Sequence, residues 1–179
     1  MAVWNVHAHD SLSLPATSVT WSSIPTTYDH LYLTASVRND QSGEVGADVE
    51  LRLGNGSVDT GSNYGFTYLY NSGGGWPALY SSTGDSLQYL YSPRASANST
   101  VWGQIGIWIP FYQSGNWKTI IADVSAPNQS TTSGEFASQA YAGRWESTAV
   151  VDTVSLLVMS GDDFVADSKF TLYGIIGAV

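Results

Sequence analysis

The chain has 179 residues, of which 43% are hydrophobic and only 12% charged, and its net charge at neutral pH is −9. Its six Lys and Arg residues are scattered without an adjacent pair, which argues against the basic patch that binding to nucleic acid or anionic lipid needs. It has no cysteine, so disulfides, thiolate metal sites and cysteine nucleophiles are excluded.

Apolar and polar residues alternate with a period of two along most of the chain, which predicts β-strands. In chain order, these runs lie at 3–9, 18–21, 30–38, 48–53, 64–70, 87–91, 104–111, 117–124, 135–141, 150–159 and 169–174. The stretches between them are rich in Gly, Asn, Asp and Ser, as turns are. No segment keeps apolar residues at helical spacing over three turns. The sequence therefore predicts an all-β fold, an antiparallel, jelly-roll-like β-sandwich of about 8–10 strands.

The domain organisation follows from the same pass along the chain. We find no internal repeat and no linker, so residues 18–179 are expected to form a single β-sandwich domain. Residues 1–17 are expected to form an N-terminal arm or edge strand that contacts a partner. The stretch 71–86 has the composition of one long loop, and loops of that length are often functional.

The last quarter of the chain carries the most specific pattern. Residues 142–175 contain two strand-like runs around an acidic loop and end in GDDFVADSKFTLYGI. Before them come SVTWSSIPTTYDHLYLTASVR at 18–38, GSNY at 61–64 and IGIWIPFYQSGNWKTI at 105–120. In this order the segments resemble a family of tailed-bacteriophage virion structural proteins. Members of that family end in a similar strand, loop and Phe-x-Leu-Tyr-Gly-Ile pattern, and the resemblance covers residues 18–175.

The resemblance implies a structural role in a virion, on a β-sandwich of the capsid-decoration (cement) or tail-fibre type. It implies no catalytic residue and no cofactor. Because so few residues precede the matching region, we expect a capsid decoration protein that binds and stabilises the outer shell. Its expected partners are the major capsid protein and itself, as a homotrimer, and its expected location is the outer capsid surface, after synthesis in the bacterial host cytoplasm. The alternative is a tail-fibre, receptor-binding or carbohydrate-binding module.

The candidate capsid contacts lie in the N-terminal segment, at Val3, Trp4, Val6, His7 and His9. His7 and His9 are two residues apart, so on a regular strand both imidazoles would point to one side and could bind one metal. No further ligand at a recognisable spacing accompanies them. A polar strand that touches a partner is the favoured interpretation, and we expect no metal site.

Two sets of carboxylates are candidates for a calcium site or a glycosidase site. An acidic loop could supply oxygen ligands to calcium, but its spacing does not match the EF-hand pattern; it contains Asp162, Asp163 and Asp167. The glutamates lie in no recognisable glycosidase motif, at Glu44, Glu50, Glu135 and Glu146. We therefore expect no enzymatic activity.

The chain is rich in aromatic residues, with seven Trp and eleven Tyr. Exposed rings can stack on sugars, whereas buried rings fill a core or a subunit interface. The candidates for an interface or a glycan-contacting loop are Trp76, Tyr80, Tyr89 and Tyr91. Packing in the core and at interfaces is the favoured use of the aromatic residues.

Overall fold

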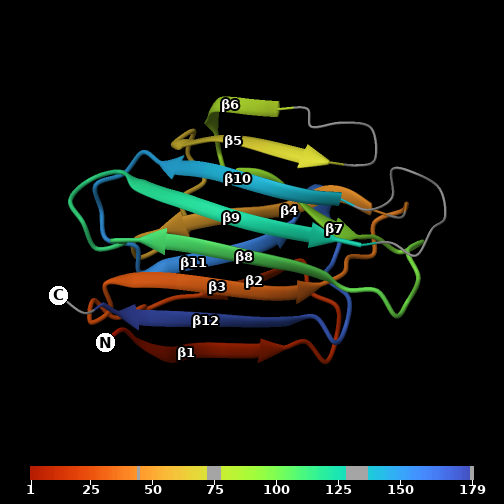
Figure 1. Cartoon of the computed structure of the whole chain (residues 1–179), viewed down its shortest axis with the longest axis horizontal. Coiled ribbons are helices and arrows are strands. Elements are labelled where there is room, and N and C mark those ends of the chain that lie inside the picture. The colour runs from red at the N-terminus through yellow and green to blue at the C-terminus, as the bar shows by residue number, and fades with distance from the viewer. Residues whose placement is uncertain (44, 72–77, 128–136, 178–179) are drawn as a thin grey trace.

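The computed structural model describes residues 1–43, 45–71, 78–127 and 137–177, and in them it is a two-layered β-sandwich (Figure 1). In the described residues, the helical element is a short 3-10 turn, Met159–Gly161. These residues contain no helix that is long and apolar enough to cross a membrane. The strands are β1 (Val3–Ser11), β2 (Ser18–Trp21), β3 (His30–Val37), β4 (Val45–Gly54), β5 (Tyr64–Asn71), β6 (Ala78–Gly84), β7 (Leu87–Pro93), β8 (Gly103–Pro110), β9 (Lys118–Ala126), β10 (Ala137–Trp145), β11 (Thr153–Val158) and β12 (Lys169–Ile176).

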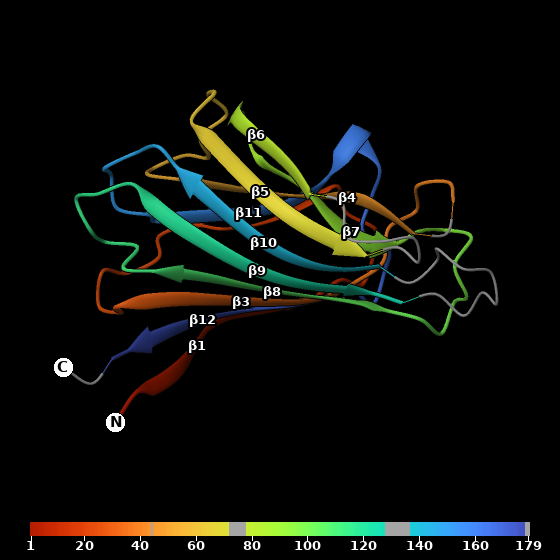
Figure 2. The ribbon, with the colours of Figure 1, turned by 45° about the horizontal axis from the view of Figure 1, so that its top comes forward.

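The two sheets differ in size. The large sheet has eight strands in the order β1-β12-β3-β8-β9-β10-β5-β6, and the small sheet has four in the order β2-β11-β4-β7. Each strand pair is antiparallel. Figure 1 looks onto the outer face of the large sheet with the small sheet behind it, and Figure 2 separates the layers and shows β1 and β12 bending away at one edge.

Alternating side chains explain why the two sheets face each other. In β3, Leu31 and Leu33 are fully buried, while Tyr32 and Thr34, which follow them, are only partly covered. In β11, Val154 and Leu156 are fully buried too, and Ser155 between them is also buried. Inward residues of both sheets form one hydrophobic cluster. Removing this apolar area from water is the main contribution to folding. The predicted antiparallel, jelly-roll-like β-sandwich is thus confirmed, with twelve strands in the described residues rather than 8–10.

The predicted long loop at 71–86 is wrong in its second half. Residues 78–84 form β6, which pairs with β5 as the outermost strand of the large sheet. The sequence of β6, ALYSSTG, is rich in small polar residues and resembles a turn.

The N-terminal segment is an edge strand rather than a free arm. β1 pairs with β12 from Val3 to Ser11, with a bulge between Val6 and Ala8. Beyond β1, Leu12 donates its N–H to the Ser168 carbonyl at 2.9 Å, and the segment remains attached as far as Ala16. Residues 3–16 are therefore an integral part of the sandwich.

Candidate functional site

The outer face of the large sheet carries a row of aromatic rings. Strand register places Tyr173 of β12 beside Tyr32 of β3, and Tyr32 beside Trp108 of β8. The ring centroids are 6.5 Å apart for Tyr32 and Tyr173 and 6.1 Å apart for Tyr32 and Trp108. These residues alternate with buried ones, so their rings lie on the side away from the core. Three neighbouring strands thus place partly exposed aromatic side chains in one line on this face.

Trp4 of β1 completes the row at the sheet edge. Its ring centroid lies 5.5 Å from that of Tyr32, 5.8 Å from that of Tyr173 and 6.4 Å from that of Trp108. The Trp4 side chain is nevertheless 53% exposed. A tryptophan so open to water is held by its aromatic neighbours rather than by the core, and its free surface is available to a ligand.

The aromatic cluster continues toward the end of β8. His30 lies 5.1 Å from Trp108 and 4.6 Å from Phe111, ring centroid to ring centroid. The Phe111 N–H donates to His30 Nδ1 at 3.1 Å, which ties the two residues together. Phe111 is 65% exposed. We name the six residues of this cluster the aromatic face: Trp4, His30, Tyr32, Trp108, Phe111 and Tyr173.

Two exposed aliphatic side chains extend the row at either end. Val6 pairs with Tyr173, and Ile121 pairs with Trp108. Both are exposed to solvent. The row Val6–Tyr173–Tyr32–Trp108–Ile121 thus crosses five neighbouring strands. Contiguous exposed apolar surface of this kind marks a binding site rather than a feature needed for folding.

A shallow groove with both apolar and polar side chains in its lining runs beside the row. It has a volume of about 300 Å³ and begins at Tyr32, whose hydroxyl leans over Gly106. A Cβ at Gly106 would lie 2.7 Å from that hydroxyl, so glycine leaves room for the Tyr32 side chain. Its polar lining consists of Thr34, Gln104, Asp123 and Ser125. Rings and hydrogen-bonding side chains therefore lie next to one another on one surface.

The predicted capsid contacts are divided by the bulge in β1. Val3, Trp4 and Val6 are exposed, and Trp4 belongs to the aromatic face. The His7 ring packs against Tyr28, with centroids 6.1 Å apart, and burial lowers its pKa. His9 Nδ1 instead lies 2.8 Å from Thr171 Oγ1. The bulge shifts the alternation of side chains along β1. The two imidazoles therefore have different neighbours, whereas on a regular strand both would point to one side.

The predicted loop aromatics lie elsewhere. Trp76 falls outside the described residues, and Tyr80 lies in β6, where its side chain is likewise not described. Tyr89 and Tyr91 lie in β7 rather than in a loop. Their rings pack on those of β5, at 5.9 Å from Phe66 for Tyr89 and 5.5 Å from Tyr70 for Tyr91. Their rings pack between the two sheets, although Tyr89 remains 38% exposed, and they lie apart from the aromatic face.

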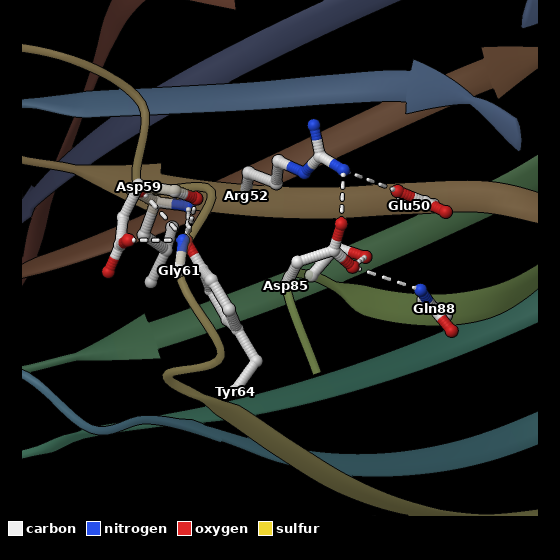
Figure 3. Close-up of polar contacts among 9 residues, drawn as sticks. Glu50, Arg52, Asp59, Gly61, Tyr64, Asp85 and Gln88 are labelled. Atoms are coloured by element: carbon white, nitrogen blue, oxygen red, sulfur yellow. Dashed lines mark hydrogen bonds and ion pairs between the residues drawn. The ribbon is translucent and has the colours of Figure 1, made fainter. Parts of the chain in front are cut away.

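The described glutamates are engaged in ion pairs. Figure 3 shows Arg52 Nη2 between Glu50 Oε2 at 3.4 Å and Asp85 Oδ2 at 3.2 Å. Burial raises the pKa of the Glu50 carboxyl, against the opposing effect of Arg52. Glu146 pairs with Arg144 at 2.7 Å. Glu44 and Glu135 fall outside the described residues.

The acidic loop residues also have protein partners. Gln41 Nε2 donates to Asp162 Oδ2, and Thr17 Oγ1 donates to Asp163 Oδ1, both at 2.9 Å. Asp167 donates its backbone N–H to the Leu12 carbonyl. Within residues 1–43, 45–71, 78–127 and 137–177, no group of three or more His, Asp or Glu side chains could hold a metal ion. This loop fastens the N-terminal segment to the sandwich.

No protein-family model matches the chain, and no curated protein matches it. Among solved structures it is similar to the CBM40 of a Ruminococcus gnavus IT-sialidase bound to alpha2,6 sialyllactose, at 8% identity and a TM-score of 0.35, over 94% of this chain and 93% of that one. It is also similar to a toad ovary galectin in complex with thio-digalactose (10% identity, TM-score 0.30, 88% and 98% covered). A third is the CBM2 module of an evolved Dit of Lactobacillus casei BL23 phage J-1 (13% identity, TM-score 0.30, 94% and 78% covered). Scores this low carry no information about what this chain binds.

Proposed function

We propose that the chain is a carbohydrate-binding β-sandwich and that the aromatic face is its binding surface. The observation that supports this proposal is the line of rings across β1, β12, β3 and β8, with a groove beside it that has polar side chains in its lining. The proposal does not depend on the similar structures.

The chemistry of a sugar ring suits this combination of side chains. A pyranose has an apolar C–H face, which stacks on an aromatic ring, and a rim of hydroxyl groups, which need hydrogen-bond partners. Tyr32 and Trp108 offer the rings, and the exposed Asp123 carboxylate and the Gln104 amide beside them offer acceptors and donors. A purely apolar patch would favour a protein partner, whereas this mixed surface favours a hydroxylated one.

The first test is a binding screen of soluble polysaccharides by affinity electrophoresis. We expect the native chain to be retarded by at least one of them, and Trp4→Ala and Trp108→Ala to weaken that binding by about tenfold, equivalent to about 1.4 kcal/mol. Leu14→Ala is the matched control, because Leu14 is exposed but does not belong to the aromatic face. Equal retardation of all three variants would contradict the proposal, as would no retardation of the native chain across the screen.

The second candidate is the virion role that the family resemblance implies, as a capsid decoration protein that attaches, as a trimer, to the major capsid protein. One observation favours it. β1 is the outermost strand of the large sheet, so one side of its backbone faces no other strand of the described chain, and Val3 is exposed on it. A free strand edge can bind a partner by adding a strand to the sheet.

This candidate predicts that Val3→Lys abolishes attachment to capsid shells that lack the protein. A lysine on a sheet edge opposes pairing with another strand, while it remains compatible with the fold because it stays in water. Leu14→Lys, which adds the same charge outside the strand, serves as the control. Binding would be measured by co-sedimentation with the shells. Normal occupancy by Val3→Lys would exclude attachment through this edge.

A further inference from the structure

We infer that the turn between β8 and β9 carries a second sugar subsite, which takes the end of an uncharged glycan chain lying on the aromatic face. The inference rests on the proposed carbohydrate-binding function and assigns to it a substrate class and a direction. Its basis is a hollow of about 410 Å³, here named the turn hollow, lined by Pro110, Phe111, Ser114, Asn116, Trp117 and Thr119.

The lining of the turn hollow matches one sugar ring. Phe111 and Trp117 are 65% and 55% exposed, so two aromatic side chains at the hollow remain open to solvent. Ser114, Asn116 and Thr119 supply hydroxyl and amide groups. None of the lining side chains is charged. A volume of this size lies within the range of small-molecule sites, about 300–1,000 Å³. The hollow therefore suits a neutral, hydroxylated ligand rather than an acidic one.

The turn is fixed from beneath, although its aromatic side chains point outward. Tyr112 is fully buried and donates its hydroxyl hydrogen to the Pro25 carbonyl. Lys118 is also buried, and its Nζ donates to the carbonyls of Ser114 at 2.7 Å and Asn116 at 2.6 Å. These contacts hold the turn in one conformation, so a ligand would pay little ordering entropy on binding there.

Phe111 is held in a backbone conformation that L-residues rarely adopt. Its φ is +48°, in the left-handed region where a glycine would be less strained. The strained residue nevertheless has a large, exposed aromatic side chain. Strained residues of this kind persist where the surrounding structure fixes them, and they gather at ligand sites.

The turn hollow is continuous with the aromatic face. His30 lies between them, with its ring 5.1 Å from that of Trp108 and 4.6 Å from that of Phe111. A glycan stacked on Trp108 would therefore follow β8 past His30 and Phe111 to reach Trp117. Only a chain of several sugar units could occupy both places at once, so affinity is expected to rise with chain length until the hollow is filled.

The test is calorimetric titration of the full chain with size ladders of cello-, malto- and N-acetylchito-oligosaccharides, from monosaccharide to hexasaccharide. We expect the affinity of the native chain to rise with length for at least one ladder. In Trp117→Ala, we expect the longest ligands to bind about tenfold more weakly and the shortest ones to bind as they do to the native chain. Phe111→Gly, which relieves the positive φ, should also weaken binding of the longest ligands without a loss of thermal stability. For a ladder of oligogalacturonates, which are charged, binding in the turn hollow should not raise the affinity.

The outcomes separate this inference from the proposed function. A length dependence that is unchanged in Trp117→Ala and Phe111→Gly would overturn the turn subsite and leave the aromatic face as a binding site. No binding of any ladder by the native chain, together with no binding in the polysaccharide screen, would overturn both. If binding in the turn hollow raised the affinity for oligogalacturonates, the assignment to uncharged sugars would be overturned.

Discussion

Replacement of Arg38 by alanine is expected to lower the free energy of unfolding by about 3–5 kcal/mol. Arg38 is only 6% exposed, and its guanidinium donates to four backbone carbonyls. Nη1 donates to the carbonyl of Asn98 and, at 2.9 Å, to the carbonyl of Val101. Nη2 donates to the carbonyl of Arg94 at 3.2 Å and to the carbonyl of Ala97 at 3.0 Å. Without the guanidinium, these carbonyls would have to find other donors, and the loop that follows β7 would lose its anchor.

Chemical denaturation of the native chain, Arg38→Ala and Arg38→Lys would test this expectation. Arg38→Lys keeps the charge but cannot reproduce the planar fork of donors, so we expect it to restore only part of the loss. Gln104→Ala is a suitable control, because Gln104 is exposed and, within the part of the chain that the structure describes, donates a single side-chain hydrogen bond, to Ser36 Oγ. A loss below about 1 kcal/mol for Arg38→Ala would mean that the carbonyls are readily satisfied by water.

Removal of Arg94 is expected to cost a similar amount, about 3–5 kcal/mol, for a different reason. The carboxylate of Asp48 is almost fully buried and is held by Arg94 Nε at 2.7 Å and Arg94 Nη2 at 2.5 Å. Asn39 Nδ2 donates to the same carboxylate at 3.0 Å. The Arg94 guanidinium fills the place where a Cβ of residue 46 would lie, so Gly46 makes the close approach possible. Arg94→Ala would leave a buried charge without its cation.

A double-mutant cycle distinguishes this cause from simple loss of packing. If the penalty comes from the uncompensated carboxylate, Arg94→Ala combined with Asp48→Asn should be more stable than Arg94→Ala alone. Unfolding in urea would measure all four proteins of the cycle. Additive losses would show that the ion pair itself contributes little and that the arginine acts through its packing.

The sequence predicted the fold class well because strand alternation is a local signal. Leu31, Leu33 and Ala35 alternate with polar neighbours, and they are buried as that pattern requires. β6 was missed because its sequence, ALYSSTG, is rich in the small polar residues that are typical of turns. The bulge in β1 was not predictable either, since it depends on pairing with β12 at the other end of the chain.

The candidate site was only partly predictable. Trp4 was identified through its N-terminal strand, but Tyr32, Trp108 and Tyr173 were not recognised as one surface. Their outward position follows from the alternation in each strand. Their proximity follows from the order β1-β12-β3-β8, which joins segments far apart in the chain. Sequence spacing contains no information about that order. Candidates were therefore chosen by the local density of aromatic residues, which pointed to Tyr89 and Tyr91.

The two proposals make different demands on β1. Carbohydrate binding uses the face of the strand, where Trp4 contacts Tyr32 and Tyr173, whereas virion attachment uses its free backbone edge. A truncation would remove both surfaces and would also leave β12 without its partner. Point substitutions at Trp4 and at Val3 are therefore the informative changes, because each alters one surface and leaves the strand in place.

The most direct test of the central claim is to locate a bound oligosaccharide by amide and aromatic NMR shifts during a titration. We expect the largest shifts at Trp4, Tyr32, Trp108 and Tyr173 and at the groove residues Gln104 and Asp123. Residues on the outer side of the small sheet should be unaffected. Saturable shifts confined to the small sheet, or to the β5–β7 aromatic residues, would contradict the account.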